Sequence, residues 1–430
     1  MSARETREGI YDTGYLELRR HHAGRWGRVE SAVWGSRLAH STQVDIGIVG
    51  AGIAGAALAA ALTGQGLSVA LLERRTGPLD TARGDHIQPA LLPVLKRWGV
   101  LDSMLAEGAE WRQGTRWFDH EGQHVVTVPA IQTDDLPNGF LFLNHERIGN
   151  VLLQRAVEGG SHYFPELERW DLERRDNCWR LVLAQPDSRQ TLDCTLLIGA
   201  DGTASRVRTE LGLGLERHSY KHPIAILYGR QRHGTGPRTL DVHLTRDRIL
   251  SLIPRTGGLT KIGFPVDHSE LPRWRGQPAA TLARQLDAWC PGLEFEQLEF
   301  GSIYPPLSQR ASAYSGPGQA LLIGDASHAM HPARSMGMNT CFRIADQLAG
   351  RLAGVDSGFT DRDIAPLIAD FETETQRTLA PLLEENHAAG LQMDTLSGDG
   401  FPALVDQLRV AAGNENVLQV MAIKASGWPF

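Results

Sequence analysis

Apolar residues in this chain fall into short continuous runs, several of which stop at a glycine or an acid. A short apolar run bounded by turn residues is typical of a strand that is buried on both faces, as in a parallel sheet. Other segments repeat their apolar positions at helical spacing, which predicts helices between the strands. The strands expected on this basis lie at 44–49, 67–72, 196–198 and 321–323, and the helices at 56–62, 89–98 and 148–157. The alternation of the two patterns predicts an α/β core.

A second group of β-like runs is separated by Gly, Pro, Asp and Ser residues, and no helical pattern interrupts it for long. Such a series predicts an inserted, mostly antiparallel sheet. Its expected strands lie at 179–184, 191–198, 224–228, 240–244, 249–253 and 261–266, with turns at 186–189, 234–237 and 256–258. Two more helices are expected at 364–387 and 402–411, followed by a variable tail.

Composition narrows the class of protein. The chain has 430 residues, of which 42% are hydrophobic and 22% charged, and its net charge is −7. This length suits one two-lobed unit, and the acidic balance argues against a nucleic-acid partner. We expect no membrane span, because no run approaches about 18 strongly apolar residues. The four cysteines are scattered without a C-x-x-C pair, which predicts free thiols, no metal site and a cytoplasmic location.

Residues 1–43 differ from the rest of the chain, since they contain seven arginines, several Trp and Tyr residues and no clear period. We interpret this segment as an N-terminal extension. Disorder, packing on a neighbour and a misassigned start codon all remain open as explanations. Its acids argue against a transit peptide, and it lacks the continuous apolar core of a secretory signal.

The first glycine motif follows the strand expected at 44–49 and reads G-x-G-x-x-G, with an alanine-rich helix after it. In such a motif the first glycine permits a tight turn, the second lets a pyrophosphate approach the backbone, and the third allows helix–strand packing. Glu73 ends the next strand, where the acid that binds the ribose is expected. This order predicts a dinucleotide site, and the alternative is a tight turn in an ordinary α/β protein. The site would include Gly50, Gly52, Ile53, Ala54, Gly55 and Glu73.

Two further acids end apolar strands. Asp201 and Gly202 follow one of them, and Gly324 and Asp325 follow another. A Gly/Asn-rich loop comes after the second acid and opens a helix, so that backbone N–H groups surround one polar ligand. Asp201 alone would be an ordinary turn residue. The loop contributes Pro332, Gly337, Met338 and Asn339.

Together these strings resemble the flavoprotein aromatic hydroxylases, the single-component FAD monooxygenases with the p-hydroxybenzoate hydroxylase fold. The resemblance runs from about 44 to 352 and includes an E-R pair and an arginine before an apolar helix, which Glu73, Arg74 and Arg83 match here. It implies a Rossmann-like FAD-binding domain with an inserted antiparallel substrate domain and C-terminal helices. The domain segments expected are 44–115, 141–215 and 306–355 for FAD, 116–140 and 216–305 for substrate, and 356–430 for the helical region.

The resemblance also assigns roles. The adenosine and pyrophosphate of non-covalent FAD should lie on Gly50 to Gly55, Glu73 and Arg83, with Asp325 near the ribityl chain. The loop from Pro332 to Asn339 should present N–H groups to the flavin pyrimidine, where reduced flavin carries negative charge. Asp201 belongs to a motif that is linked in the family to both FAD and NAD(P)H.

Three positions depart from the family pattern. Ser335 stands where the loop usually has a glycine, and Ile344 stands where the family has an aspartate. His145 replaces a flavin-contacting arginine, with Arg147 two residues away. These departures bear on flavin movement and on the kind of substrate.

The implied reaction uses NADPH or NADH to reduce FAD, and O2 then forms a flavin C4a-hydroperoxide. This species would hydroxylate or epoxidise an aromatic or polycyclic small molecule, in secondary metabolism or aromatic degradation, in a monomer or homodimer. A phenolic or indolic substrate would be helped by a general base. The candidates on the expected sheet are Tyr220, His222, Tyr228, Asp241 and His243, although each residue alone is more often structural.

Three other functions remain open. A flavin halogenase shares the fold, but its W-x-W-x-I-P string is absent from the sequence. A non-oxygenating reductase or cyclase would be compatible with Ser335 and Ile344. A binding protein on the same scaffold would not need FAD, and a colourless purified protein would favour it.

Overall fold

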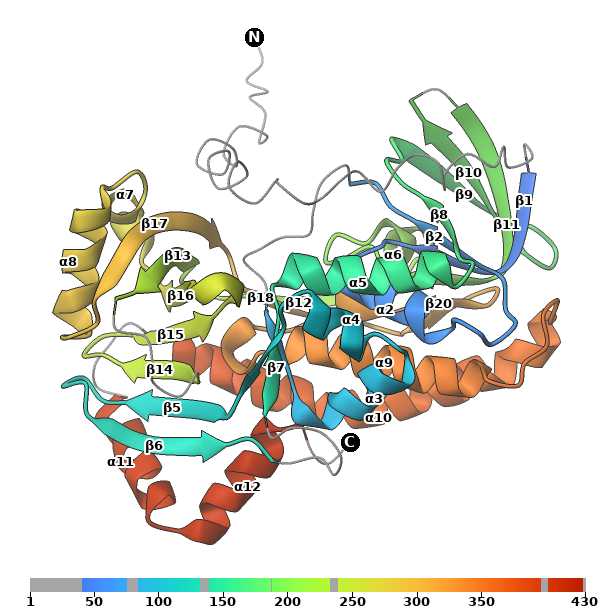
Figure 1. Cartoon of the computed structure of the whole chain (residues 1–430). Helices are drawn as coiled ribbons and strands as arrows, with labels where there is room; N and C mark the ends of the chain where they lie inside the picture. The colour runs from blue at the N-terminus through green and yellow to red at the C-terminus, as the bar shows by residue number, and fades with distance from the viewer. Residues whose placement is uncertain are drawn as a thin grey trace.

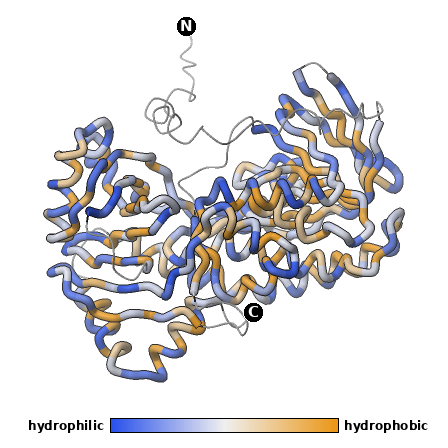
Figure 2. Tube along the Cα trace, in the orientation of Figure 1, coloured by the Kyte–Doolittle hydropathy of each residue, from blue (hydrophilic) through white to orange (hydrophobic). Residues whose placement is uncertain are grey.

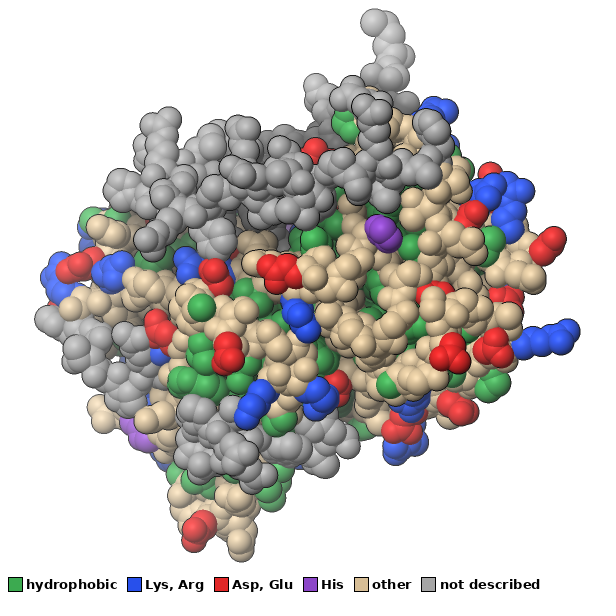
Figure 3. All heavy atoms as spheres, turned by 45° about the vertical axis from the view of Figure 1, so that its right-hand side comes forward, with side chains coloured by type: hydrophobic (Ala, Val, Ile, Leu, Met, Phe, Trp, Pro, Cys, Tyr) green, Lys and Arg blue, Asp and Glu red, His purple; other side chains and the backbone are tan. Residues whose placement is uncertain are grey.

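The computed structural model describes residues 41–75, 84–131, 139–186, 188–232, 239–395 and 401–427. Two lobes lie side by side in Figure 1, an α/β lobe at the right and a lobe built on a seven-stranded sheet at the left. Apolar segments concentrate in the strands and helices at the centre of the α/β lobe in Figure 2. Figure 3 shows acidic and basic side chains interspersed over one face of the molecule.

The α/β lobe is organised by an eight-stranded sheet whose central strands are parallel. Its main order is β19-β20-β11-β1-β2-β8, and β10 and β9 extend β11 as an antiparallel ribbon. From β1 the sheet continues to β2 and β8 on one side and to β11 and β20 on the other, so the direction of strand addition changes at β1. Ligands of α/β proteins bind at such a point, beyond the carboxyl ends of the strands. The strands are β1 (Ser41–Val49), β2 (Val69–Leu72), β8 (His162–Phe164), β9 (Arg169–Arg174), β10 (Trp179–Gln185), β11 (Ser188–Gly199), β19 (Ser315–Gly316) and β20 (Ala320–Leu322).

The helices of this lobe pack around α2, every residue of which is buried. Helix α2 contacts both α5 and α9, so it forms the centre of a helical layer. An alanine-rich sequence suits this position, because small side chains let neighbouring elements approach closely. The bounds are α2 (Ile53–Ala61), η1 (Pro89–Leu91), α3 (Leu92–Arg97), α4 (Leu101–Ala106), α5 (His145–Glu158), α6 (Arg206–Glu210), η4 (Gly324–Ala326), η5 (Pro332–Arg334) and α9 (Met336–Leu352).

The second lobe contains a seven-stranded sheet in the order β17-β13-β16-β15-β14-β5-β6. All pairs are antiparallel except β14 with β5. Helices α7 and α8 cover one side, which Figure 1 shows at the left edge of the molecule. The elements are β5 (Gly114–Phe118), β6 (His124–Pro129), β13 (Ile224–Gln231), β14 (Leu240–Leu244), β15 (Ile249–Pro254), η2 (Thr256–Gly258), β16 (Thr260–Pro265), η3 (His268–Glu270), α7 (Leu271–Trp274), α8 (Ala279–Trp289) and β17 (Phe295–Tyr304).

Both faces of this sheet are buried, and successive residues alternate between them. We call the face that packs on α7 and α8 the outer face; it carries Ala225, Leu227, Leu250, Leu252, Ile262 and Phe264. We call the opposite face the inner face; it carries Ile224, Ile226, Tyr228, Leu240, Val242 and Leu244. The inner face packs against Phe140 and Phe142, which belong to the α/β lobe, and against the C-terminal helices.

Two small antiparallel sheets lie between the lobes. One has the order β3-β7-β4, with β3 (His86–Ile87), β7 (Phe140–Phe142) and β4 (Glu110–Arg112). The other has the order β12-β18-β21, with β12 (Leu215–Ser219), β18 (Leu307–Ala311) and β21 (His328–Ala329). In the first sheet Ile87 and Leu141 join the core of the α/β lobe, whereas Phe140 and Phe142 join the inner-face cluster. This sheet therefore has one side in each hydrophobic core.

A 33-residue helix, α10 (Asp361–Met393), runs beneath both lobes in Figure 1. It begins with a capping box between Thr360 and Asp363, in which side chains satisfy free backbone N–H groups. Just after its end, the carboxylate of Asp394 accepts hydrogen bonds from the backbone N–H groups of Lys221 and His222, both at 2.7 Å. Helices α11 (Phe401–Ala412) and α12 (Glu415–Ala425) follow and lie against β6.

Most elements that the apolar pattern predicts are present within a few residues. The four strands expected between 224 and 266 are β13 to β16, and the hairpin expected after 179 is β10 with β11. The expectation of a variable tail after 411 was wrong, since α12 forms there. No helix in the described ranges is long and apolar enough to cross a lipid bilayer.

Candidate functional site

The glycine motif forms a tight turn between β1 and α2. Gly50 has a φ of 107°, and a Cβ there would lie 2.4 Å from the carbonyl oxygen of Ala200. A Cβ on Gly55 would lie 1.9 Å from the oxygen of Gly50, so the helix can approach the strand only without a side chain. At Gly52 a Cβ would meet no described atom within 4 Å. The helix start has neither a side-chain cap nor an acid in its first turn, so its N–H groups are free to donate hydrogen bonds to a pyrophosphate.

Glu73 stands at the end of β2, beside this turn. One of its oxygens accepts a hydrogen bond from the N–H of Ala51 at 3.0 Å, and the same oxygen lies 2.7 Å from the guanidinium of Arg75. Burial raises the pKa of Glu73, but the hydrogen bonds from Arg75 and Ala51 outweigh burial and hold the pKa below its ordinary value. The carboxylate is therefore ionised and fixed at the edge of the motif. Arg74 is exposed next to it, and Arg83 lies outside the described residues.

Asp201 uses its carboxylate within the protein. It accepts hydrogen bonds from Ser205 Oγ at 2.5 Å and from the backbone N–H groups of Arg206 and Val207 at 2.7 and 3.1 Å. These contacts cap the start of α6, which is the structural role expected of an acid at a helix start. Gly202, the next residue, has a φ of 83°, a conformation that favours glycine.

Gly324 and Asp325 form the 3-10 turn η4 after β20. A Cβ on Gly324 would lie 2.5 Å from Cβ of Ala54, so this turn packs directly on the start of α2, beside Ile53. Gln309 donates a hydrogen bond to the backbone oxygen of Asp325 at 2.8 Å. Arg208 joins the same region to the second motif, since its guanidinium donates to the oxygen of Ala326 at 2.8 Å. Three motifs that are far apart in the sequence thus meet at the carboxyl ends of β1, β11 and β20.

The loop after η4 leads into α9. Asn339 is completely buried; its amide nitrogen donates to the backbone oxygens of His86 and Ser335, and its amide oxygen accepts from the N–H of Gln88. Helix α9 has no side-chain cap, and a Cβ on Gly337 would meet no described atom within 4 Å. The first turn of α9 is therefore a second open helix start. Met338 is buried behind it, and Pro332 is exposed.

Ser335 has the left-handed conformation, with a φ of 52° and a ψ of 32°. This conformation costs a residue with a Cβ about 1–2 kcal/mol. The left-handed conformation is one that glycine adopts without this cost, so Ser335 stands at a position whose backbone suits a glycine. Ile344, the other departure in this helix, is buried in the core of the α/β lobe.

A buried ionic network joins the inner face to the α/β lobe. Asp85 lies 2.7 Å from the ammonium of Lys261 on β16 and 3.5 Å from the guanidinium of Arg255. Arg255 also pairs with Glu146 at 2.9 Å, and Asp85 accepts the N–H of His145. Burial raises the pKa of Asp85, but the charges of Lys261 and Arg255 outweigh burial and hold it below its ordinary value. The motif search missed this network because its members come from four separate segments.

The sequence candidates for a general base lie in three different places. The hydroxyl of Tyr220 is 2.8 Å from Nδ1 of His387, and the Tyr220 ring packs on His331, just before the loop at 332–339 that we call the flavin loop after the role expected for it. His222 is tied to the end of α10, with Nδ1 2.6 Å from the backbone oxygen of Asp394. Tyr228 is on the inner face, beneath the guanidinium of Arg255. Tyr220 and His222 precede β13 and therefore lie beside the seven-stranded sheet.

His243 and Asp241 lie on the outer face. His243 is directly opposite Leu250, and Asp241 is opposite Leu252, in a sheet whose paired residues point to the same side. Asp241 forms a two-point ion pair with Arg116, and the His243 ring stacks on Phe118 at 4.6 Å. Both residues therefore face α7 and α8 and point away from the α/β lobe.

The structure draws attention to His86, which the sequence analysis did not select. Neither ring nitrogen has a hydrogen-bond partner within the described part of the chain, and burial lowers the pKa of His86 to about 4. A buried polar group without a partner costs about 1–3 kcal/mol. No sequence signal marks this residue, because β3 is only two residues long and has no readable alternation.

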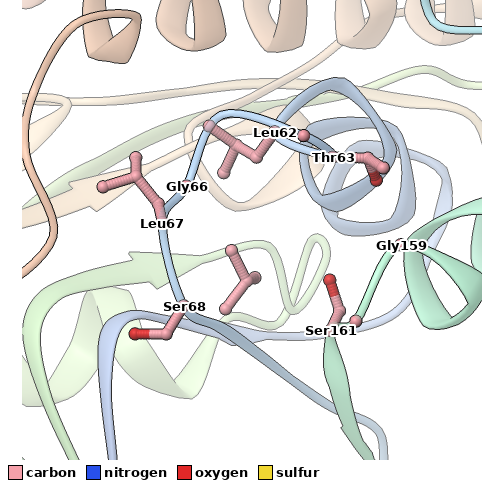
Figure 4. A pocket seen from close by; sticks show the side chains of 10 residues that line it. Leu62, Thr63, Gly66, Leu67, Ser68, Gly159 and Ser161 are labelled. Carbon is pink, nitrogen blue, oxygen red and sulfur yellow. The ribbon is translucent and has the colours of Figure 1, made fainter.

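A pocket of about 500 Å³ lies away from these motifs, at the carboxyl end of α2 (Figure 4). It is lined by Thr63, Ser68 and Ser161 together with leucines and glycines. The amino-terminal end of α2, where the three motifs meet, is at the opposite end of the helix. We therefore assign no part of the nucleotide site to this pocket.

Comparison with known proteins identifies the family. The family model described as FAD binding domain matches residues 43–365. The 6-methylpretetramide 4-monooxygenase of Streptomyces rimosus is 27% identical over 74% of this chain, which spans 57% of that relative's length. The 3-demethoxyubiquinol 3-hydroxylase of Escherichia coli (strain K12) is 25% identical over 73% of this chain and 80% of its own length.

Solved structures share the fold. The p-nitrophenol 4-monooxygenase of Pseudomonas putida DLL-E4 has a TM-score of 0.75 and 17% sequence identity, covering 90% of this chain and all of that one. An aklavinone-11 hydroxylase in a ternary complex with FAD and aklavinone has a TM-score of 0.66 and 22% identity, covering 84% of this chain and 72% of that one.

The fold and the three converging motifs define an FAD-binding oxidoreductase. The chain belongs to the FAD binding domain family, as an FAD-dependent monooxygenase of the p-hydroxybenzoate hydroxylase-like group.

Proposed function

We propose that this enzyme hydroxylates or epoxidises an aromatic or polycyclic small molecule, with NADPH or NADH as electron donor and O2 as oxidant. The observation that carries the proposal is the apolar, aromatic inner face that packs beside the flavin loop. Ile226 and Tyr228 lie on this face, and Phe140 and Phe142 pack against it. A site of this composition suits a flat ring system, since small-molecule sites are mostly apolar with a few polar groups.

In this proposal FAD lies across the point where the three motifs meet. The open helix start at Gly52, with Gly50 and Gly55 behind it, holds the pyrophosphate, and Glu73 holds the ribose. Asp325 lies along the ribityl chain, and the first turn of α9 faces the pyrimidine. When bound, the flavin supplies the reduction and the activation of oxygen, while the protein orients the substrate and excludes water.

The electron donor would dock transiently. The sequence contains a single G-x-G-x-x-G motif, so we propose no separate nicotinamide domain. The segments at Arg83 and Asp201 would receive NADPH or NADH. We further propose a cytoplasmic monomer or homodimer, a location supported by four cysteines that are all free thiols.

The geometry of the loop bears on the non-oxygenating alternatives. They gained support from Ser335, which replaces a glycine. Because Ser335 adopts the left-handed backbone conformation, the loop does not need a different path. We therefore retain oxygenation as the proposed reaction.

The test begins with the purified protein, which should be yellow and should release FAD on heating. NADH and NADPH oxidation is then followed in the presence of phenols, indoles and polyketides, with mass spectrometry of the products. A ring product heavier by one oxygen atom is expected. Reduction of a double bond or cyclisation without oxygen incorporation would contradict the proposal, and a colourless protein that does not take up FAD would remove its basis.

A further inference from the structure

His86 points toward the inner face of the seven-stranded sheet. In the antiparallel pair of β3 with β7, His86 is directly opposite Phe142, and residues paired in this way point to the same side. Phe142 and Phe140 belong to the inner-face cluster, whereas the neighbouring Ile87 belongs to the core of the α/β lobe. The imidazole therefore lies at the junction of the two lobes.

The position of His86 is fixed by the flavin loop. Its backbone oxygen accepts a hydrogen bond from the side chain of Asn339 at 3.0 Å, and Asn339 also accepts from the N–H of Gln88 at 2.9 Å. Asn339 is in the first turn of α9. The imidazole is thus held between the loop that faces the flavin and the apolar wall that faces the substrate.

The surroundings of the ring are aromatic. The ring of Phe142 is stacked on the imidazole at 5.0 Å, and Phe140 meets it edge-on at 4.3 Å. Arg112, on the same side of the next strand pair, lies 5.7 Å from the Phe142 ring and is paired with Glu110 at 2.7 Å. Neither ring nitrogen of His86 reaches a hydrogen-bond partner among the described residues.

We propose that His86 is the polar contact of the substrate site and forms a hydrogen bond with a hydroxyl or keto oxygen on an aromatic ring. This inference rests on the proposed function. A neutral imidazole has one N–H donor and one acceptor nitrogen, so it can either donate a hydrogen bond to a phenol oxygen or accept one from a phenol hydroxyl. The low pKa keeps the ring uncharged at neutral pH. In this proposal Phe140 and Phe142 pack on the ring system of the substrate, and His86 forms the hydrogen bond with the oxygen on that ring.

The outer face contains a matched control. His243 is also buried, has no hydrogen-bond partner for either ring nitrogen among the described residues, and stacks on a phenylalanine. Burial lowers its pKa to about 4 as well. It differs from His86 in facing α7 and α8. A change at His243 therefore reproduces the structural effects of a change at His86 without touching the proposed site.

The experiment compares His86→Phe, His86→Gln and His243→Phe as FAD-loaded proteins. The probes are 2-naphthol and 2-methoxynaphthalene, which share a ring system but differ in the hydroxyl hydrogen. Binding is measured by the change in flavin absorbance, and thermal unfolding checks that each variant is folded. Phenylalanine resembles imidazole in shape and fills the same aromatic sandwich, so we expect His86→Phe to fold.

The parent and His243→Phe should bind 2-naphthol about 10-fold more tightly than its methyl ether, which corresponds to about 1.4 kcal/mol. His86→Phe should lose this preference, and His86→Gln should keep part of it. Equal preference in His86→Phe and the parent would overturn the inference, as would an equal loss in both phenylalanine variants. A parent that does not distinguish the probes, or binds neither, would overturn it too.

Failure of the role proposed for His86 can be distinguished from failure of the proposed function. If the parent oxygenates a ring substrate with NAD(P)H and His86→Phe does so with unchanged substrate selectivity, only the role of His86 is wrong. If the FAD-loaded parent oxygenates no ring substrate, the proposed function is wrong, whatever the variants bind.

Discussion

The two faces of the seven-stranded sheet have similar residue compositions but pack against different parts of the molecule. Each face is buried, is mostly apolar and lies next to charged pairs. On the outer side Arg116 pairs with Asp241 on the adjacent strand of the same sheet. On the inner side the acids that pair with Lys261 and Arg255 are Asp85 and Glu146, which belong to the α/β lobe.

The role of a buried charged side chain is thus better inferred from the location of its ion-pair partner than from how deeply the side chain is buried. A pair within one sheet stabilises that sheet. A pair across two lobes also fixes how the lobes pack on each other, and the proposed substrate site lies at their junction. The following predictions test this distinction, from the largest expected effect to the smallest.

Asp85→Ala should cause the largest loss of stability. It removes the carboxylate that pairs with the buried ammonium of Lys261, while Arg255 keeps its pair with Glu146, and removing one partner of a buried ion pair costs about 3–5 kcal/mol. The free energy of unfolding in urea measures the effect. Asp241→Ala is the control on the outer face, where the partner Arg116 is partly exposed, so the loss should be smaller.

A double substitution sharpens this prediction. Asp85→Asn combined with Lys261→Met removes both charges, and an uncharged replacement of a buried pair is often tolerated. It should recover much of the stability lost in Asp85→Ala. A double variant as unstable as Asp85→Ala would indicate that the charges themselves are not responsible.

Asp325→Ala should weaken FAD binding roughly 10- to 100-fold. A hydrogen bond to a charged group contributes about 1.5–3 kcal/mol, and about 1.4 kcal/mol corresponds to tenfold in affinity. Titration of FAD into the apoproteins, followed by quenching of flavin fluorescence, measures the effect. Asp241→Ala should bind FAD as the parent does. Parental affinity in Asp325→Ala would mean that the flavin lies elsewhere.

Acid should weaken the fold through several buried histidines, of which His86 and His243 represent the two faces of the sheet. The pKa of His86 and that of His243 are about 4 in the folded protein, below the value of about 6.5 in the unfolded chain. The unfolded state therefore binds more protons between these values, so stability is full above about pH 6.5 and falls as the pH approaches 4. Between pH 6.5 and 5.5 each histidine should account for a loss of about 1 kcal/mol.

Replacing either histidine by phenylalanine should flatten the stability profile by a similar amount, which urea unfolding at several pH values can measure. The groups next to His243 are Asp241 and Arg116, and those near His86 are Arg112 and Glu110. The two faces should thus behave alike in stability and differ only in ligand selectivity. An unchanged slope in both variants would show that other groups control the acid response.

The smallest effect is expected from relieving backbone strain. Ser335 and Gln297 both have a φ of 52°, one in the flavin loop and one on the exposed strand β17. Glycine at either position should raise stability by up to about 1 kcal/mol, because it adopts this conformation without a steric cost. Only Ser335→Gly should change the rate of FAD binding, measured by stopped flow. A changed rate in Gln297→Gly would contradict the assignment of the loop.

The sequence predicted the parts of this site that lie on local motifs. The strand, glycine turn and helix around Gly50 can be read from neighbouring residues, because their roles depend on local geometry. Four of the seven strands of the inserted sheet, β13 to β16, could also be read, since each has an apolar run of its own. The two faces could not be assigned, because a period of two separates residues without showing which side meets the other lobe.

Residues whose roles depend on contacts with distant segments of the chain could not be predicted from the sequence. His86 and Asp85 gain their roles from β7, β16 and α9, which come from separate parts of the chain. His243 was named as a candidate general base for its residue type and its place on an expected strand, and the fold turns it away from the α/β lobe. Helix α12 was missed because its apolar positions are weakly periodic and most of its residues are exposed.

Helix α10 has a consequence for how this chain can vary in length. The 33-residue helix α10, which contains Pro366 and Pro381, joins three regions of the molecule. Glu372 accepts a hydrogen bond from the N–H of Tyr314 beside the eight-stranded sheet, Asn386 donates to the oxygen of His331 just before the loop at 332–339, and Asp394, just past the helix end, accepts from the N–H of His222, which precedes β13. Inserting one residue between Glu372 and Asn386 would turn the remaining contacts by about 100° around the axis and move them about 1.5 Å along it. The number of residues in α10 therefore sets the distance between the eight-stranded sheet and the seven-stranded sheet. We expect insertions in this chain only in the loops outside the helix.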